Sequence, residues 1–155
     1  MRVRAYAPGD AAAMADLYQR SVRELGPADY LPEQVEAWAE AGPTAERLEE
    51  LMVDGRRGLI VVSDDDRMIG FTDVEADGHI AFLYVAPEAK GRGAADLLLG
   101  AVQAIAAEAG ITRLCSEASE AARRFFVRRG FLVLHRRDFD VGGVPIHNYA
   151  VEKVF

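Results

Sequence analysis

The spacing of apolar residues changes repeatedly along the chain, between the two-residue period of a strand and the 3.6-residue period of a helix. Residues 2–7 alternate in the way a strand does, and a helical spacing begins after the turn Pro8-Gly9. We expect Asp10 to cap that helix, because a carboxylate at this position can accept hydrogen bonds from the first free N–H groups. The predicted apolar stripe of this helix consists of Met14, Leu17, Tyr18 and Val22.

Two shorter helices are predicted at 30–38 and 44–53, where they form a wall or lid beside the sheet. Longer helices follow at 94–109, ending before Gly110, and at 119–129. The further predicted strands are 58–63, 68–75, 79–86, 111–115, 131–140 and 144–155. The fold class is therefore α/β, or more closely α+β: one domain spanning 1–155, with a mixed, mostly antiparallel sheet of about seven strands and helices on both faces.

One turn stands out, because only the unit strand 79–86, helix, strand 111–115 must be a parallel crossover. Its first turn is Lys90-Gly91-Arg92-Gly93-Ala94-Ala95. Glycines let the main chain approach a ligand, and a helix N-terminus offers free N–H groups and roughly half a positive charge. Such a turn can cradle a pyrophosphate, with Arg92 and Lys90 as counter-charges, or it can be only a tight connection. On these residues alone both interpretations remain open.

The composition and charge limit the classes of protein to which this chain can belong. The chain has 155 residues, half of them apolar at 50%, which supports a real core in one domain. A net charge of -7 argues against nonspecific nucleic-acid binding. The chain has no apolar run of about eighteen residues, which is the length that would predict a membrane span. Its first residues alternate between polar and apolar instead of forming an apolar signal core, so we expect a cytoplasmic protein.

Cysteine and acidic clusters add little chemistry. Cys115 is the single cysteine, which excludes an internal disulfide, and we interpret it as an inert core residue. Asp64 to Asp66 are interpreted as a solvated turn, because their spacing lacks a calcium-loop pattern. No metal is expected.

The order of elements and the turn at 90–95 resemble the acetyl-coenzyme A loop of the GCN5-related N-acetyltransferases, the GNAT superfamily. Lys90 stands where that family has arginine or glutamine, whereas Gly93 and Ala95 match. The family's next motif consists of an asparagine, an alanine, an aromatic residue and a glycine-phenylalanine pair. In this chain the corresponding positions hold Ser119, Ala122, Phe126, Gly130 and Phe131. The resemblance covers nearly the whole chain, and segments 30–38 and 117–126 resemble a little-characterised bacterial branch.

The resemblance implies acetyl-coenzyme A as the cofactor. Its pantetheine arm would bind the main chain of one strand like an added strand, and its pyrophosphate would rest on the glycine-rich turn. The later helix would face the same arm. The residues so assigned to the cofactor are Leu83, Tyr84, Val85, Lys90, Gly91, Arg92, Gly93, Ala94, Ala95, Ser119, Arg123 and Phe126. Arg124, Arg128 and Arg129 are interpreted instead as a solvated helix face.

Acetyl transfer to an amine needs a neutral nucleophile, a polarised thioester carbonyl and a proton for the departing thiolate. The main-chain N–H of Val85 can polarise the carbonyl. In the family a tyrosine usually supplies the proton, but Phe126 occupies its position. His79 matches the strand on which several family members carry a base, although it can also be an ordinary residue beside a turn. Glu117 can anchor a cationic substrate, orient a water molecule or satisfy local main chain.

The acceptor site is less defined. Asp73 and Glu75 share a strand face, and they either meet an amine across the cleft or form the solvent-facing half of the strand. Tyr30 and Trp38 either line the acceptor pocket, where aromatic rings attract ammonium groups, or pack in the core. The acceptor itself, whether small molecule, peptide or protein, has no sequence signature.

The expected activity is direct N-acetyl transfer in a ternary complex, because no activated nucleophile is evident for a covalent intermediate. The alternatives are a non-catalytic acyl-coenzyme A binding or sensing domain and a domain that has lost the cofactor. Expected partners are an amine-bearing acceptor and a second copy pairing through a late strand such as 131–140, without nucleic acid or membrane.

Overall fold

The computed structural model describes all 155 residues and divides the strands between two four-stranded sheets. The first sheet has the order β1-β2-β3-β5 and is antiparallel throughout, with β1 (Arg2–Ala5), β2 (Arg57–Val62), β3 (Met68–Val74) and β5 (Leu83–Val85). The second has the order β4-β6-β8-β7, with β4 (His79–Ile80), β6 (Arg113–Ala118), β8 (Val144–Val154) and β7 (Leu132–Val141).

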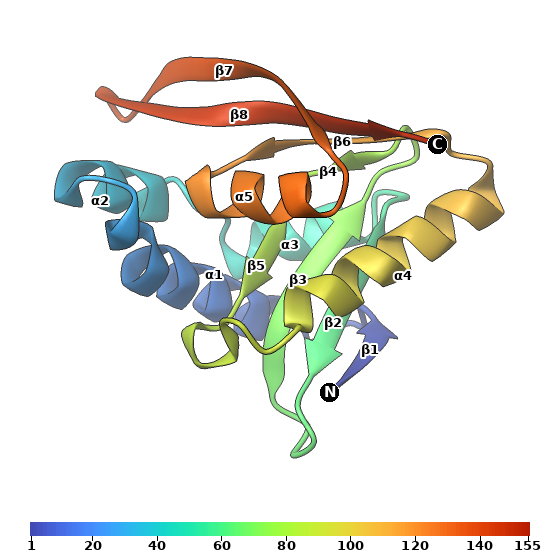
Figure 1. The fold of residues 1–155 in the computed structure, drawn as a ribbon. Helices are drawn as coiled ribbons and strands as arrows, with labels where there is room; N and C mark the ends of the chain where they lie inside the picture. The colour runs from blue at the N-terminus through green and yellow to red at the C-terminus, as the bar shows by residue number, and fades with distance from the viewer.

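Five helices cover these sheets. They are α1 (Ala11–Leu25), α2 (Pro32–Glu40), α3 (Ala45–Met52), α4 (Ala94–Ala109) and α5 (Glu120–Arg128), with short 3-10 turns η1 (Gly26–Ala28) and η2 (Pro87–Ala89). Figure 1 shows α4 on one side of β2 and β3, with α1 and α3 on the other, while α5 lies under the long β7–β8 hairpin. The predicted helices on both faces are therefore confirmed. No helix has the length and apolar character that crossing a bilayer demands.

The predicted strand 79–86 is wrong in one respect, because it is interrupted at Ala81 and Phe82. Its first part, β4, pairs parallel with β6, with His79 opposite Cys115. Its second part, β5, pairs antiparallel with β3. The break sends the two halves of one predicted strand into different sheets, so the single sheet expected from the sequence is in fact two. The parallel crossover between 79–80 and 113–118 is confirmed.

The core forms where the helical stripe predicts it. Met14, Leu17, Tyr18 and Val22 are all buried against the first sheet. Asp10 does not cap α1 with its side chain, contrary to the prediction. Its carboxylate accepts hydrogen bonds from Arg4 and from the N–H of Ala7, because the strand β1 ends close beside it.

Candidate active site

The glycine-rich turn leads directly into α4. Gly91 and Gly93 have left-handed backbones, with φ of +75° and +89°, and Gly93 precedes the first helical residue. The N–H of Leu97 bonds to the carbonyl of Gly93, whereas the N–H groups of Ala94 and Ala95 have no main-chain acceptor. Free donors at a helix N-terminus are the feature that binds phosphate oxygens.

A cleft of about 360 Å³ runs from this turn along β5 to α5. Of the residues predicted to bind the cofactor, Leu83, Tyr84, Val85, Lys90, Gly91, Ala95 and Ser119 line it. Arg92 lines a separate hollow beside Met1 and Glu88. Gly93 and Ala94 form the turn behind the lining, where Ala94 is 1% exposed. The cleft therefore joins the partly buried strand β5 to the helix N-terminus.

Two residues predicted on α5 lie away from the cleft. Arg123 forms an ion pair with Glu120 and stacks over the ring of Tyr149, at 4.7 Å from its centroid. Phe126 is 1% exposed, and its ring centroid lies 4.7 Å from that of Phe131. The motif position of Phe126 thus carries a core ring, because α5 turns this face toward the second sheet.

Other side chains of α5 take their place. Ala122, Phe125 and Arg128 line the cleft, together with Arg124. The three-residue spacing of 122, 125 and 128 marks one helical face, and this periodicity is the sequence signal that could have identified Phe125. Arg124 is not simply solvated, since it forms a two-pronged ion pair with Asp29, with its shorter contact at 2.8 Å.

Tyr30 and Trp38 both line the opposite wall of the cleft, with rings 5.5 Å apart in an edge-to-face arrangement. Tyr30 is also a structural link. Its hydroxyl donates to the carbonyl of His147 at 2.9 Å and accepts from the N–H of Glu120 at 3.1 Å. The wall of the cleft is thereby tied to β8 and to the first turn of α5.

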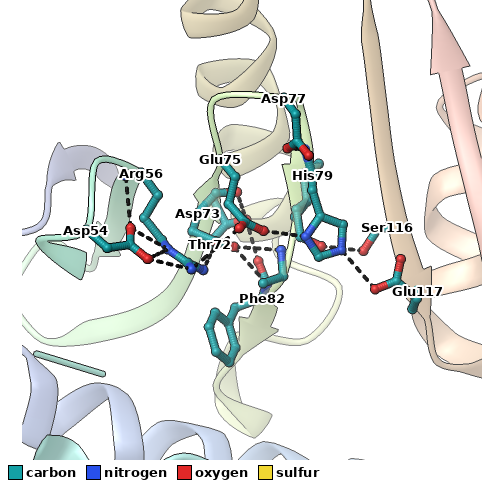
Figure 2. A network of polar contacts seen from close by, with 12 residues as sticks. Asp54, Arg56, Thr72, Asp73, Glu75, Asp77, His79, Phe82, Ser116 and Glu117 are labelled. Carbon is teal, nitrogen blue, oxygen red and sulfur yellow. Dashed lines mark hydrogen bonds and ion pairs between the residues drawn. The ribbon is translucent and has the colours of Figure 1, made fainter. Parts of the chain in front are cut away.

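His79 lies between two carboxylates on the β4 side of the strand break (Figure 2). Its Nε2 contacts Glu117 at 2.8 Å, and its Nδ1 is in contact with Glu75. Only an imidazolium can donate from both ring nitrogens. The hydrogen bond to Glu117 is the largest cause that raises the pKa of His79 to about 9; burial opposes it, and Glu75 adds to it. His79 also lowers the pKa of Glu117.

The three residues His79, Glu75 and Glu117 are thus brought together, but they are not part of the lining of the cleft along β5. At neutral pH the imidazole carries a proton and has no free lone pair. A base on this strand must therefore lose a proton first, which requires a higher pH.

Asp73 neither meets solvent nor faces the cleft, which corrects both sequence interpretations of it. The side chain is fully buried and forms an ion pair with Arg56 at 2.8 Å. Burial raises the pKa of Asp73 to about 6, against the opposing effect of hydrogen bonds from the main chain and Arg56. The carboxylate is accordingly ionised at neutral pH.

Arg56 is a residue that the sequence analysis missed. It precedes β2, its side chain is only 7% exposed, and it also contacts Asp54 at 2.9 Å and Glu75 at 3.5 Å (Figure 2). An arginine next to a strand is common on protein surfaces, so no local signal distinguishes this one.

The comparison with protein families agrees with this arrangement. Residues 27–153 match the model of the acetyltransferase (GNAT) domain. A domain of this kind is an acyltransferase. The chain belongs to the GNAT acetyltransferase family.

Similar proteins extend over nearly the whole chain. An uncharacterised N-acetyltransferase of Mycobacterium tuberculosis is 27% identical over 149 residues, covering 92% of this chain and 96% of the relative. The uncharacterised N-acetyltransferase YafP of Escherichia coli is also 27% identical, covering 96% and 93%. A crystal structure of a GCN5-related N-acetyltransferase from Rhodopseudomonas palustris has a TM-score of 0.90 and 31% identity, covering 99% and 94%.

The PaiA N-acetyltransferase from Thermoplasma acidophilum, solved in complex with coenzyme A, has a TM-score of 0.78. It is 20% identical, and the match covers 99% of this chain and 98% of that one. At this identity the likeness concerns the fold.

Proposed function

We propose that this protein transfers an acetyl group from acetyl-coenzyme A directly to an amine, with both substrates bound at once. The observation that carries the proposal is the continuous cleft between the unpaired edge of β5 and the N-terminus of α4. β5 pairs with β3 on one edge only, so its other edge can bind the amides of a pantetheine arm. The donors at Ala94 and Ala95 suit a pyrophosphate.

The main-chain N–H of Val85 is suited to polarise the thioester carbonyl. The N–H of Ala86 donates to Ile69 on β3. Because successive N–H groups of a strand point in opposite directions, the N–H of Val85 is directed away from β3 and toward the cleft. It can donate to the oxygen on which negative charge develops.

In the proposed reaction the amine nitrogen bonds to the carbonyl carbon, the carbon–sulfur bond breaks, and the thiolate leaves. In this proposal the proton that the amine loses passes through water to neutral His79, which lies outside the lining of the cleft, and this requirement favours turnover at alkaline pH. Glu117, with an exposed side chain, is suited to hold the incoming ammonium before that step. The thiolate takes a proton from water, because Phe126 has none to give and the proton of the amine goes to His79.

In the proposed complex the acceptor lies beside Tyr30 and Trp38 on the wall of the cleft, and Glu75 enters only through its contact with His79 outside that lining. The two rings offer faces for a cation, and the carboxylate lies next to His79. This position leaves the pyrophosphate end of the cleft to the cofactor.

The first experiment is calorimetric titration of acetyl-coenzyme A and of coenzyme A into the native protein and into Gly93→Glu. We expect binding of micromolar order in the native chain, lost in the variant. Gly110→Glu is the matched control, because Gly110 is also left-handed, at φ +72°, and lies at the far end of α4. Absence of binding to the native protein would refute the proposal.

A non-catalytic sensor of acyl-coenzyme A is the second candidate. It is favoured by the protonated state of His79 and by Phe126 at the position of the usual acid. Thiol release from acetyl-coenzyme A with a panel of amines, measured between pH 7 and pH 9.5, separates the two. Amine-dependent release supports catalysis, whereas tight binding without release at any of these pH values supports the sensor.

A further inference from the structure

Side chains hold the bent segment of main chain between β4 and β5 by hydrogen bonds. Asp73 Oδ1 accepts hydrogen bonds from the N–H of Ala81 at 2.9 Å and from the N–H of Phe82 at 2.8 Å. In an extended strand two successive N–H groups point in opposite directions. Both can reach one oxygen atom only if the chain is bent between them. The carboxylate therefore fixes a bend that the strand would not otherwise adopt.

Two hydroxyl groups complete the set. Thr72 Oγ1 donates to the carbonyl of Phe82 at 2.6 Å, and Ser116 Oγ donates to the carbonyl of Ile80 at 2.7 Å (Figure 2). Thr72 comes from β3 in the first sheet and Ser116 from β6 in the second. The bent segment is thus bonded by side chains from both sheets between which it passes.

Arg56 keeps the central carboxylate charged. Its Nη1 donates to Asp73 Oδ2 at 2.8 Å, which is the oxygen that the bent segment does not use. Asp73 is fully buried and Arg56 nearly so, and a buried carboxylate stays ionised only with such a partner. The same guanidinium lies 3.5 Å from Glu75, the partner of His79. Arg56 therefore contacts both Asp73, which bonds the bent segment, and Glu75, which contacts His79.

We propose that Asp73, held by Arg56, is a positioning residue that sets the bend between β4 and β5, and with it the direction of the Val85 N–H. This inference rests on the proposed function, since β5 lines the cleft in which the cofactor would bind. Phe82, bonded at both its N–H and its carbonyl, is directly followed by Leu83, the first residue of β5. A change at the bend therefore passes directly to the strand that lines the cleft.

The test is a graded series at Asp73. Asp73→Asn keeps an oxygen for the two N–H groups but loses the charge opposite Arg56, whereas Asp73→Ala loses both. We expect hydrogen exchange of the Ala81 and Phe82 amides, measured by NMR, to accelerate at least ~10-fold in Asp73→Ala. Coenzyme A should bind ~10-fold more weakly there, and Asp73→Asn should lie between Asp73→Ala and the native protein for both quantities.

Asp10→Asn is the matched control. It neutralises a carboxylate at the start of α1 that is paired with Arg4, bonded to one main-chain N–H and not bonded to the bent segment. We expect a comparable loss of thermal stability, with coenzyme A affinity unchanged within ~2-fold. If Asp10→Asn weakens binding as much as Asp73→Asn does, the effect of Asp73 is only on stability and the inference is wrong.

Thr72→Val serves if Asp73→Ala does not fold. This substitution keeps the shape and removes the hydroxyl that donates to Phe82 and lies 3.5 Å from the carbonyl oxygen of Asp73, so we expect a smaller loss of affinity, ~3-fold, with faster exchange confined to the bent segment. Unchanged exchange and unchanged affinity in a folded Thr72→Val or Asp73→Asn variant would overturn the inference. The exchange readout needs no ligand, so a native protein that fails to bind coenzyme A would refute the proposed function without deciding the role of Asp73.

Discussion

Replacing Glu117 with glutamine tests the charge state of His79 directly. The amide keeps the shape of the side chain and can still accept from Nε2, but it removes the negative charge next to the imidazolium. The pKa of His79 is about 9 against an ordinary 6.5, and the bond to Glu117 is the largest cause. This difference corresponds to about 300-fold tighter proton binding. Since Glu117 supplies the largest share, we expect the pKa of His79 in Glu117→Gln to fall most of the way toward 6.5, and each unit of that fall corresponds to about 1.4 kcal/mol.

The assay is a pH titration of ¹⁵N-labelled histidine by NMR, which needs neither cofactor nor acceptor. Glu75→Gln should lower the same pKa by a smaller amount, because Glu75 contributes less than Glu117. Glu36→Gln, which removes the exposed partner of Arg23, is the control and should leave His79 unchanged. If His79 titrates near 6.5 in the native protein, the account of the doubly bonded imidazolium is refuted. If the acetyl-transfer rate rises with pH, the midpoint of that rise should shift in Glu117→Gln together with the pKa of His79.

Three further results are expected. Because the folded-state pKa of His79 lies above its unfolded value, its ion pairs stabilise the fold fully below pH 6.5, and this stabilisation is lost as pH rises through about 9. The urea midpoint of the native protein should fall over that pH range, whereas that of His79→Gln should stay constant. A constant midpoint in the native protein would contradict the ion pairs. Gly93→Glu should weaken coenzyme A binding at least ~100-fold, whereas equal affinities for it and Gly110→Glu would remove the phosphate loop. Tyr30→Phe should lower the free energy of unfolding by about 0.5–1.5 kcal/mol, because it removes the hydrogen bonds to a partly buried N–H and a partly buried carbonyl; an unchanged urea midpoint would contradict that link.

Much of the fold is predictable from the sequence because periodicity is a local property. The stripe of α1 is buried as its spacing indicates, and the crossover from β4 to β6 is parallel as the connection requires. The glycine-rich turn lies at the start of α4, with both Gly91 and Gly93 in left-handed conformations. Each of these features is decided by neighbours in sequence.

The features that sequence reasoning missed depend on distant contacts. The interruption at Ala81 follows from Asp73 eight residues earlier, and the charge of Asp73 depends on Arg56, seventeen residues before it. Residues 80–86 form one unbroken apolar run, so no pattern predicts a break there. On α5 the family motif pointed to Phe126, whereas packing against Phe131 buries that ring and leaves Phe125 at the cleft.

The division into two sheets has a consequence for synthesis of the chain. All strands of the first sheet lie before residue 86, and they pair only with one another. β4 lies among them in sequence, but its partner β6 begins at Arg113. A growing chain emerges from the ribosome N-terminus first, so the first sheet can assemble while His79 and Ile80 still have no strand beside them. The nascent protein can therefore contain the phosphate turn and β5 before α5 and the second wall of the cleft have been made.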